Sequence, residues 1–360
     1  MNWVTVCGGG NGAHALIGTI LLSDQENNVR LYLPIEDERK RFEDAVHAHS
    51  EFVRHADGKR HSVASKRIQV TGNAQAAADS SVIIIAVPAF AHEDVLSQLA
   101  PYIGGKIVAV LPARSGLEFQ ARQIFAAAKQ DKVTLIGFQT LPWACRTEEF
   151  GQSVMIYGTK KRLGAASMPA AEASNQTDMF SSLFGMKVVP YRSMLELSLA
   201  NTGQLIHPGI MYGAFSEKLQ RVYPSRSEAP LFYASVDDRT ASILSSMSDE
   251  VLEIKAALEN EMPTVAMDNV VHLSRWLSQT YAGEISDPSS LMRKFRTNKG
   301  YQTLKAPVRA KDDGYVIDTT ARYLTEDLPF GLVVTRGIGS LVGVKTPSTV
   351  SYTHLRAHET

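Results

Sequence analysis

The stretch that decides the fold is WVTVCGGGNGAHALIGTILL, residues 3–22. It begins with an apolar run, Val4 to Cys7, typical of a buried strand, and ends with the apolar helix pattern of Ala13 to Leu22. The glycines between them fit the pattern G-x-G-x-x-A in the context it requires, a strand followed by a loop and a helix. A side chain at Gly8 would obstruct the tight turn, and one at Gly10 would hold the backbone away from a pyrophosphate. We therefore predict a dinucleotide-binding loop whose cofactor contacts come from Gly8, Gly10, Asn11, Gly12 and Ala13.

The turn after the second predicted strand, Asn28 to Leu33, bears on which dinucleotide is bound. An acid at the end of this strand would normally hold the ribose hydroxyls, but residues 32–35 read Tyr-Leu-Pro-Ile, and Glu36 and Asp37 follow slightly late. No Arg or Lys occupies this turn to receive a 2′-phosphate. NAD is therefore favoured over NADP.

The third predicted strand, Ser81 to Val87, leads into a rigid turn at the edge where a doubly wound sheet presents its ligand crevice. We expect Pro88 and Phe90 to line the nicotinamide side of the cofactor site. His92 has two interpretations, a catalytic group or a structural residue in the first turn of the next helix, and the structural one is favoured.

Apolar strands continue to alternate with helix patterns, which predicts an α/β Rossmann-type dinucleotide-binding domain over residues 1–192. The other expected strands are Lys106 to Leu111, Val133 to Phe138, Ser153 to Tyr157 and Lys187 to Pro190, and the expected helices include Glu36 to Ala48 and His92 to Leu99. Ser62 to Thr71 is interpreted as a small strand insertion, and the Ala- and Ser-rich residues Leu163 to Asn175 as an exposed connection.

From Ser193 the pattern changes to long amphipathic segments, such as Ala241 to Ala257 and Thr264 to Gln279. They predict an all-α second domain over residues 193–348. Residues 349–360 are polar without an amphipathic face and are interpreted as a tail that is disordered or foreign to the fold.

Composition excludes several classes of partner. Lys plus Arg and Asp plus Glu both number 37, so no net field draws the protein to nucleic acid or to an anionic membrane, and a small-molecule partner is favoured. Two cysteines cannot form a disulfide framework, and the N-terminus does not resemble a signal peptide, so a cytoplasmic protein is expected. The residues do not determine the oligomeric state, for which a monomer is favoured. His354 and His358 have the spacing of a helical metal site, but nothing nearby completes one, and no metal is predicted.

Seven ordered blocks, spread over the chain up to about Ser348, carry a resemblance to one known family. They are VCGGGNGAH (6–14), VPAFAHE (87–93), TLPWACR (140–146), HP and YG (207–208 and 212–213), EAPLFY (228–233), TNK (297–299) and RYLTED (322–327). These blocks resemble the opine dehydrogenases, particularly the octopine and tauropine dehydrogenases of marine invertebrates. The resemblance implies an NADH-dependent reductive condensation of a 2-oxo acid, pyruvate, with the amino group of an amino acid.

The same resemblance assigns the central chemistry to a histidine–aspartate pair that matches His207 and Asp327. Imidazole is suited to this reaction because it both gives and takes protons near neutral pH, and a carboxylate would fix its tautomer. Without the resemblance, His207 lies in an apolar stretch where a core histidine would be the commoner case. Arg322 is suited to bind a substrate carboxylate at two points, although a surface salt bridge is the alternative.

Further substrate contacts are expected at Gln139, Thr140, Cys145, Trp276 and Arg114. Cys145 is interpreted as a lining residue rather than a nucleophile, and Trp276 as a wall of the amino-acid pocket. Octopine-forming relatives have an acidic residue at the position of Gln139 and an uncharged one at that of Arg114. A buried arginine substrate would need the missing carboxylate, so the sequence favours a small amino acid with a neutral or anionic end, such as taurine, β-alanine, glycine or alanine.

Two other functions stay open at this point. A dehydrogenase of the 3-hydroxyacid or glycerol-phosphate type would depend on a lysine in the second domain, for which Lys299 is the candidate in a matched block. A nucleotide-binding sensor that has lost catalysis is the other alternative. It gains weight because relatives continue past the position of Ser348 with further helical sequence, so the helical domain is expected to lack its last elements.

Overall fold

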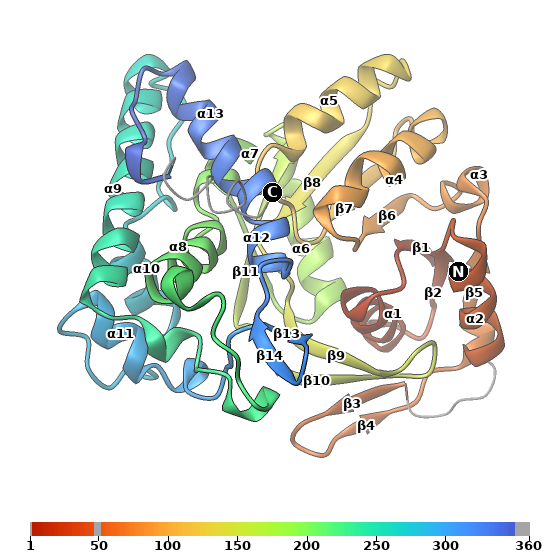
Figure 1. Ribbon diagram of the computed structural model, residues 1–360. Helices are drawn as coiled ribbons and strands as arrows, with labels where there is room; N and C mark the ends of the chain where they lie inside the picture. Colours follow the sequence, from red (N-terminus) through yellow and green to blue (C-terminus); the bar gives the residue numbers. More distant parts are fainter. Residues whose placement is uncertain (1, 47–51, 350–360) are drawn as a thin grey trace. The chain divides into compact units, whose positions relative to one another are not determined.

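The computed structural model describes residues 2–46 and 52–349, which divide into two compact units, Met1–Leu197 and Ser198–Thr360. The sequence analysis put the boundary after residue 192, a few residues earlier than this division. Each unit is described separately below (Figure 1).

The first unit is built on an eight-stranded sheet with the strand order β12-β11-β8-β7-β6-β1-β2-β5. Its strands are β1 (Asn2–Cys7), β2 (Asn27–Tyr32), β5 (Ile68–Thr71), β6 (Val82–Ile85), β7 (Ile107–Val110), β8 (Thr134–Phe138), β11 (Arg162–Met168) and β12 (Lys187–Pro190). All neighbours pair in parallel except β11, which runs antiparallel to β8. The strand order reverses direction between β1 and β6, so the crevice expected of a doubly wound sheet lies at their carboxyl ends.

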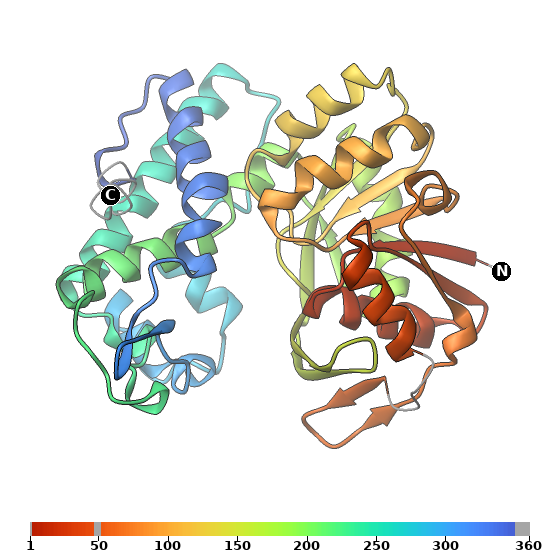
Figure 2. The ribbon, with the colours of Figure 1, turned by 45° about the vertical axis from the view of Figure 1, so that its right-hand side comes forward.

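Helices connect these strands and bury their apolar faces against the sheet. They are α1 (Asn11–Ser23), α2 (Glu36–Val46), α3 (Ala74–Ala77), α4 (His92–Leu99), α5 (Leu117–Ala127) and α6 (Glu172–Phe184). The residues Leu16, Ile17, Ile20 and Leu21 of α1 are fully buried, and α1 also contacts α6. The helices α4 and α5 lie side by side in both ribbon views (Figures 1 and 2). The Rossmann-type prediction is confirmed for this unit.

A smaller four-stranded sheet with the order β4-β3-β10-β9 also belongs to the first unit. It consists of β3 (Val53–His55), β4 (Arg60–His61), β9 (Trp143–Glu149) and β10 (Ser153–Thr159). The interpretation of Ser62 to Thr71 as an insertion was therefore wrong in part. The inserted hairpin is β3–β4, whereas residues 68–71 form β5 at the edge of the main sheet, where Val29 pairs with Ile68.

The interpretation of Leu163 to Asn175 as an exposed connection was also wrong. Residues 163–168 belong to β11, where Leu163, Ala165 and Ala166 are at most 2% exposed, and residues 172–175 begin α6. Small side chains are needed here because the neighbours are close: a Cβ on Gly164 would lie 2.6 Å from the ring of Tyr191. The composition typical of a loop thus reflects tight packing in a buried strand.

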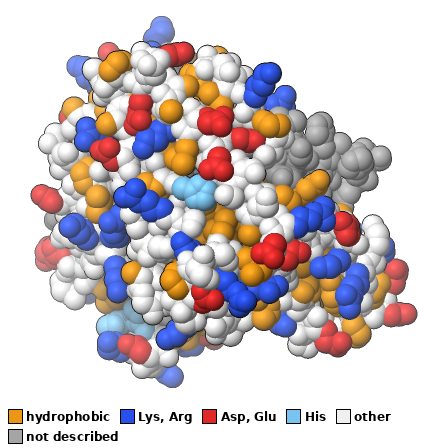
Figure 3. All heavy atoms as spheres, turned by 90° about the vertical axis from the view of Figure 1, so that its left-hand side faces the viewer, with side chains coloured by type: hydrophobic (Ala, Val, Ile, Leu, Met, Phe, Trp, Pro, Cys, Tyr) orange, Lys and Arg blue, Asp and Glu red, His pale blue; other side chains and the backbone are white. Residues whose placement is uncertain are grey.

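The second unit is mainly helical, as predicted. Its helices are α8 (Gly203–Phe215), α9 (Asp238–Glu261), α10 (Leu273–Thr280), α11 (Leu291–Thr297), α12 (Arg322–Thr325) and α13 (Val333–Leu341), and α7 (Met194–Leu199) crosses the boundary between the units. One hairpin, β13 (Val308–Lys311) with β14 (Gly314–Ile317), was not expected. Side chains of both charges are interspersed over the face that Figure 3 shows.

Helix α9 illustrates how the sequence sets the ends of these elements. Asp237 caps its first turn by accepting a hydrogen bond from the backbone N–H of Thr240 at 2.8 Å. The helix ends before Pro263, and the helix predicted over residues 264–279 is present only as α10. In the segment before α10 the backbone forms turns and also bonds to side chains. For example, Glu259 accepts from the Met267 N–H at 3.0 Å, and Lys255 donates to the Val270 carbonyl at 3.2 Å.

The predicted tail begins one residue too early. Thr349 is fully buried, and its N–H and hydroxyl donate to the Glu250 carboxylate at 2.9 and 2.7 Å. Thr349 therefore packs with the helical unit, whereas residues 350–360, including His354 and His358, lie outside the described residues.

Candidate active site

The glycine loop follows β1 and lies beside the end of β6. Gly8 has a φ of +113°, and a Cβ there would lie 2.8 Å from both the Ala86 carbonyl oxygen and Val87 Cγ1, so only glycine fits. At Gly10, by contrast, a Cβ would meet no atom within 4 Å. Gly10 precedes α1, whose first N–H groups receive no cap from a side chain. Open space in front of a helix start fits the pyrophosphate of NAD.

The buried His14 side chain holds the glycine loop in place through hydrogen bonds at both ring nitrogens. Its Nδ1 lies 3.0 Å from the Gly10 carbonyl oxygen, and its Nε2 accepts a hydrogen bond from the Gly151 N–H at 2.8 Å. The rings of Phe42, Phe52 and Phe150 surround the imidazole. Burial lowers the pKa of His14 to about 4, so the ring is neutral and donates from Nδ1 to Gly10. Ala13 beside it, also predicted to contact the cofactor, is fully buried and exposes no surface to a ligand.

The start of α1 is also joined to the block that contains Cys145. The Asn11 side chain accepts from the Thr147 N–H at 2.9 Å, and the Cys145 thiol lies 3.5 Å from the Asn11 carbonyl oxygen. Burial raises the pKa of Cys145 to about 11, which suits a lining residue rather than a nucleophile. A Cβ on Gly12 would lie 3.0 Å from the Leu141 side chain, so this glycine permits close packing of the two segments.

Pro88 and Phe90 follow β6 in the turn predicted to line the nicotinamide side. The Phe90 side chain is 69% exposed, which is unusual for a phenyl ring and leaves a face available to a ligand. His92 begins α4 and is 3% exposed, in the position that the structural interpretation expected. Burial lowers its pKa to about 4, opposed by a hydrogen bond with the Val87 backbone and assisted by the charge of Arg114.

Three predicted substrate residues follow the next strands at the same edge of the sheet. Arg114 comes after β7, and Gln139 and Thr140 come directly after β8. The Gln139 N–H donates to the Gly164 carbonyl at 2.9 Å, and its side-chain oxygen accepts from the Tyr191 hydroxyl at 3.3 Å. These contacts hold the neutral Gln139 amide at the end of β8.

Lys160 is a residue of this edge that the sequence analysis missed. It lies in the turn between β10 and β11, and its ammonium donates to Thr140 Oγ1 at 2.7 Å and to the Leu141 carbonyl at 2.9 Å. Both acceptors are neutral, and among the described residues no carboxylate forms an ion pair with it. Although the side chain reaches solvent, the protein atoms around it disfavour the ammonium and lower the pKa of Lys160 to about 8.

In the second unit, His207 and Asp327 form a hydrogen-bonded pair. His207 lies in α8, and Asp327 stands between α12 and the π-helical turn Leu328–Leu332. The His207 Nδ1 lies 2.8 Å from Asp327 Oδ2; the carboxylate is 2% exposed, and the imidazole is 22% exposed. The carboxylate can only accept, so Nδ1 carries a proton and Nε2 is the nitrogen left to react.

Aromatic side chains hold this histidine on its other sides. The Tyr233 hydroxyl lies 3.3 Å from Nε2, and the Tyr323 ring stacks on the imidazole with centroids 4.1 Å apart. Arg322, next to Tyr323, is 71% exposed, and its Nε lies 3.3 Å from the buried Glu326 carboxylate. This ion pair uses Nε, which leaves the two terminal nitrogens of the guanidinium for an external carboxylate.

Trp276 is connected to the same cluster through a row of tyrosines. Its ring meets Tyr281 edge-to-face at 5.9 Å, Tyr281 meets Tyr301 at 5.0 Å, and Tyr301 stacks on Tyr233 at 3.9 Å. The structure thus brings His207, Asp327 and Arg322 together in the second unit, and Trp276 lies at the far end of this row of rings. It gathers the glycine loop with Cys145, Gln139 and Thr140 in the first unit.

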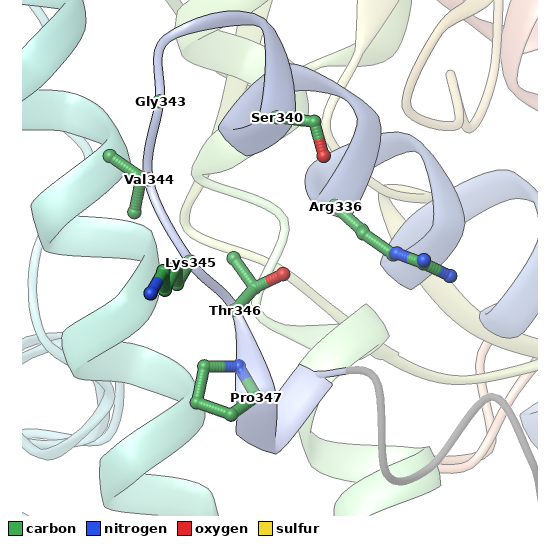
Figure 4. A pocket seen from close by; sticks show the side chains of 7 residues that line it. All are labelled: Arg336, Ser340, Gly343, Val344, Lys345, Thr346 and Pro347. Atoms are coloured by element: carbon green, nitrogen blue, oxygen red, sulfur yellow. The ribbon is translucent and has the colours of Figure 1, made fainter.

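Other candidate sites receive no support. Lys299, required by the hydroxyacid-type alternative, is exposed in a 3-10 turn after α11. Within residues 2–46 and 52–349, no three His, Cys, Asp or Glu side chains gather as metal ligands, and none of the helices found there is long and apolar enough to cross a membrane. A hollow in the second unit, lined by Arg336, Ser340 and residues 343–347, contains none of the predicted site residues (Figure 4).

Sequence reasoning missed Tyr233, Tyr323, Lys160 and His14. Tyr233, Tyr323 and His14 lie inside the blocks that carry the family resemblance, but no role was predicted for them. Lys160 lies outside every such block. Its place beside Thr140 depends on the antiparallel return of β11 along β8.

Comparisons with known proteins agree with this arrangement. Residues 190–357 match the family described as NAD/NADP octopine/nopaline dehydrogenase, alpha-helical domain, and residues 4–110 match that described as NADP oxidoreductase coenzyme F420-dependent. The octopine dehydrogenase of Mizuhopecten yessoensis is 36% identical over 96% of this chain and 86% of its own length. The tauropine dehydrogenase of Arabella iricolor is 33% identical over 96% of this chain and 88% of its own.

A solved structure of octopine dehydrogenase with NADH and L-arginine superposes with a TM-score of 0.90 and 32% identity. The match covers 100% of this chain and 89% of that one. A second structure of octopine dehydrogenase, with NADH and pyruvate, gives a TM-score of 0.85.

Proposed function

Because this chain belongs to the opine dehydrogenase family and is an NAD-dependent oxidoreductase, we propose that it joins pyruvate to the amino group of a small amino acid with an anionic end. The observation that carries the proposal is the 2.8 Å bond between His207 and the buried Asp327. It supplies a proton donor and acceptor of fixed tautomer, which an imine-forming reaction requires.

The chain's own residues account for the proton steps. The amino nitrogen attacks the ketone carbon, and the ketone oxygen becomes a hydroxyl that must leave as water. His207 Nε2 supplies the proton for that departure, while Asp327 stabilises the imidazolium that precedes it. When bound, NADH supplies the hydride that completes the secondary amine.

Arg322 is proposed to bind the carboxylate of the 2-oxo acid. Its exposed guanidinium offers two parallel N–H groups, and Glu326 fixes its position through Nε. Pyruvate is the proposed 2-oxo acid because it is the one named in the solved structure of a relative with NADH. In the first unit, Gly8, Gly10 and the start of α1 would hold the pyrophosphate, and Pro88 and Phe90 would lie beside the nicotinamide.

The class of amino acid is inferred from charge at the carboxyl edge of the main sheet. Gln139 is a neutral amide, and both Arg114 and Lys160 are cations, so nothing among these three would offset a guanidinium substrate. The Lys160 ammonium donates two hydrogen bonds, to Thr140 and to Leu141. These bonds orient the ammonium and leave its third N–H for a ligand. A carboxylate or sulfonate would satisfy it, as in β-alanine or taurine.

The enzyme is further proposed to be a cytoplasmic monomer. Cys7 and Cys145 are both free thiols, which suits a reducing compartment. Gel filtration of the active protein tests the oligomeric state: elution as a dimer would overturn the monomer.

The proposal is tested by following NADH absorbance with pyruvate and, in turn, taurine, β-alanine, glycine, alanine and arginine. Oxidation that requires an amine, and is faster with taurine or β-alanine than with arginine, is expected. Oxidation with pyruvate alone would contradict the condensation, and a preference for arginine would contradict the inferred class of amine.

A further inference from the structure

Tyr233 lies beside His207 Nε2, the nitrogen that supplies the proton to the departing oxygen, and none of the proton steps described so far uses it. Its hydroxyl lies 3.3 Å from His207 Nε2. The other ring nitrogen, Nδ1, is bonded to Asp327, and one face of the ring is covered by Tyr323. Nε2 is therefore the ring nitrogen left to react, and the Tyr233 hydroxyl lies beside it. The same hydroxyl also shares a hydrogen bond with the Tyr323 side chain.

The surrounding rings fix the position of this hydroxyl. Tyr233 is 8% exposed, stacks on Tyr301 at 3.9 Å with planes 13° apart, and meets Phe232 edge-on at 5.0 Å. A ring packed on both sides cannot turn away, so the hydroxyl stays beside His207. Tyr301 differs in one respect: its hydroxyl bonds to Tyr281 at 3.0 Å and not to the histidine.

Burial also keeps Tyr233 protonated. It raises the pKa of Tyr233 well above its ordinary value, and the nearby Tyr323, Tyr281 and Asp327 act in the same direction. The side chain is therefore a neutral O–H donor throughout the neutral pH range. It donates to Nε2 when His207 is neutral, and it is free to donate elsewhere once Nε2 carries a proton.

We propose that Tyr233 is a second donor to the reacting oxygen: its O–H and the His207 Nε2–H converge on the ketone oxygen of the 2-oxo acid. Two donors 3.3 Å apart can both reach one oxygen at ordinary hydrogen-bond lengths. This inference rests on the proposed function and names a residue that polarises its 2-oxo acid.

The proton balance is simple. The amine nitrogen bonds to the ketone carbon, and the π bond to oxygen breaks. The oxygen takes one proton from the attacking amine and one from His207, and it leaves as water. Tyr233 keeps its own proton and stabilises the negative charge that develops on the oxygen in between.

The test replaces the hydroxyl alone. Tyr233→Phe keeps the stacked ring, and we expect it to lower kcat/KM for pyruvate about 100-fold, as loss of one donor to a developing oxyanion does. The KM for NADH should stay within about twofold of wild type. Tyr301→Phe is the matched control, because it removes a hydroxyl from the same stack without a contact to His207, and it should retain wild-type kinetics. Wild-type activity of Tyr233→Phe, or an equal loss in both variants, would overturn the proposal.

A second probe covers a failure of Tyr233→Phe to fold. Incorporation of 3-fluorotyrosine at position 233 preserves the shape and makes the hydroxyl a stronger acid, so a direct donor role predicts a higher kcat/KM for pyruvate. An unchanged value would count against the proposal. Wild-type enzyme without amine-dependent NADH oxidation would instead refute the proposed function, so the two failures are distinguishable.

Discussion

Replacement of Asp327 by asparagine isolates the charge of the histidine–aspartate pair. The amide is nearly the same size as the carboxylate, so packing at this 2% exposed position should survive. What is lost is a charge-assisted hydrogen bond of 2.8 Å, which contributes about 1.5–3 kcal/mol to the protonated imidazole. At about 1.36 kcal/mol per tenfold in rate, kcat should fall by about 10- to 160-fold.

The assay is amine-dependent NADH oxidation at saturating NADH. Asp318→Asn is the control, because that carboxylate caps Thr320 at 2.9 Å in the same unit and has no contact with the histidine. NADH binding, followed by fluorescence, should be unchanged in both variants, since the glycine loop belongs to the other unit. If Asp327→Asn retained kcat within about threefold of wild type, the assigned role of the pair would be refuted.

Three further predictions follow from other parts of the structure. Gly10→Ala should leave the melting temperature unchanged, because its Cβ meets no protein atom, but it should weaken NADH binding at least about tenfold. Gly8→Ala should lower both the melting temperature and the affinity for NADH. Equal effects of the two variants would refute the assignment of Gly10 to the pyrophosphate site. Lys160→Met should raise the KM for taurine or β-alanine about tenfold, with Lys161→Met unaffected; no change would remove Lys160 from the amine site. The pKa of His14 is lowered from 6.5 to about 4, so the unfolded chain binds that proton first as pH falls. Through this group alone the free energy of unfolding should drop by about 2 kcal/mol from pH 7 to pH 5, measured by urea titration, and the drop should shrink in His14→Gln; an identical slope in the variant would contradict the shift.

Much of the first unit could be predicted from sequence because its strands are strongly apolar and its glycine pattern has few alternative uses. The expected strands at residues 4–7, 28–33 and 133–138 differ from β1, β2 and β8 by at most two residues at either end. The failure at β11 has a physical cause: Ala, Gly and Ser are the side chains of a loop and also of a strand against which a tyrosine ring packs closely.

The candidate site was less predictable, because its residues come together only through tertiary structure. His207 lies in an apolar helix and precedes Pro208, so its local sequence suggests a core residue, and only the resemblance to a family assigned it to chemistry. Asp327 is 120 residues away in the chain. Tyr233 looks like an ordinary core aromatic by composition, and its contact with Nε2 becomes visible only when η6 (Tyr233–Ser235) is placed beside α8.

The central claim is that a ketone is reduced only after it has condensed with an amine, and the most direct measurement follows the transferred hydride. Pyruvate and taurine are incubated with the enzyme and NADH that carries deuterium at the transferred position, and the products are weighed by mass spectrometry. The account predicts a secondary amine with one deuterium on the former ketone carbon and no labelled lactate. Labelled lactate, formed at the same rate with and without taurine, would contradict it and point to a hydroxyacid dehydrogenase.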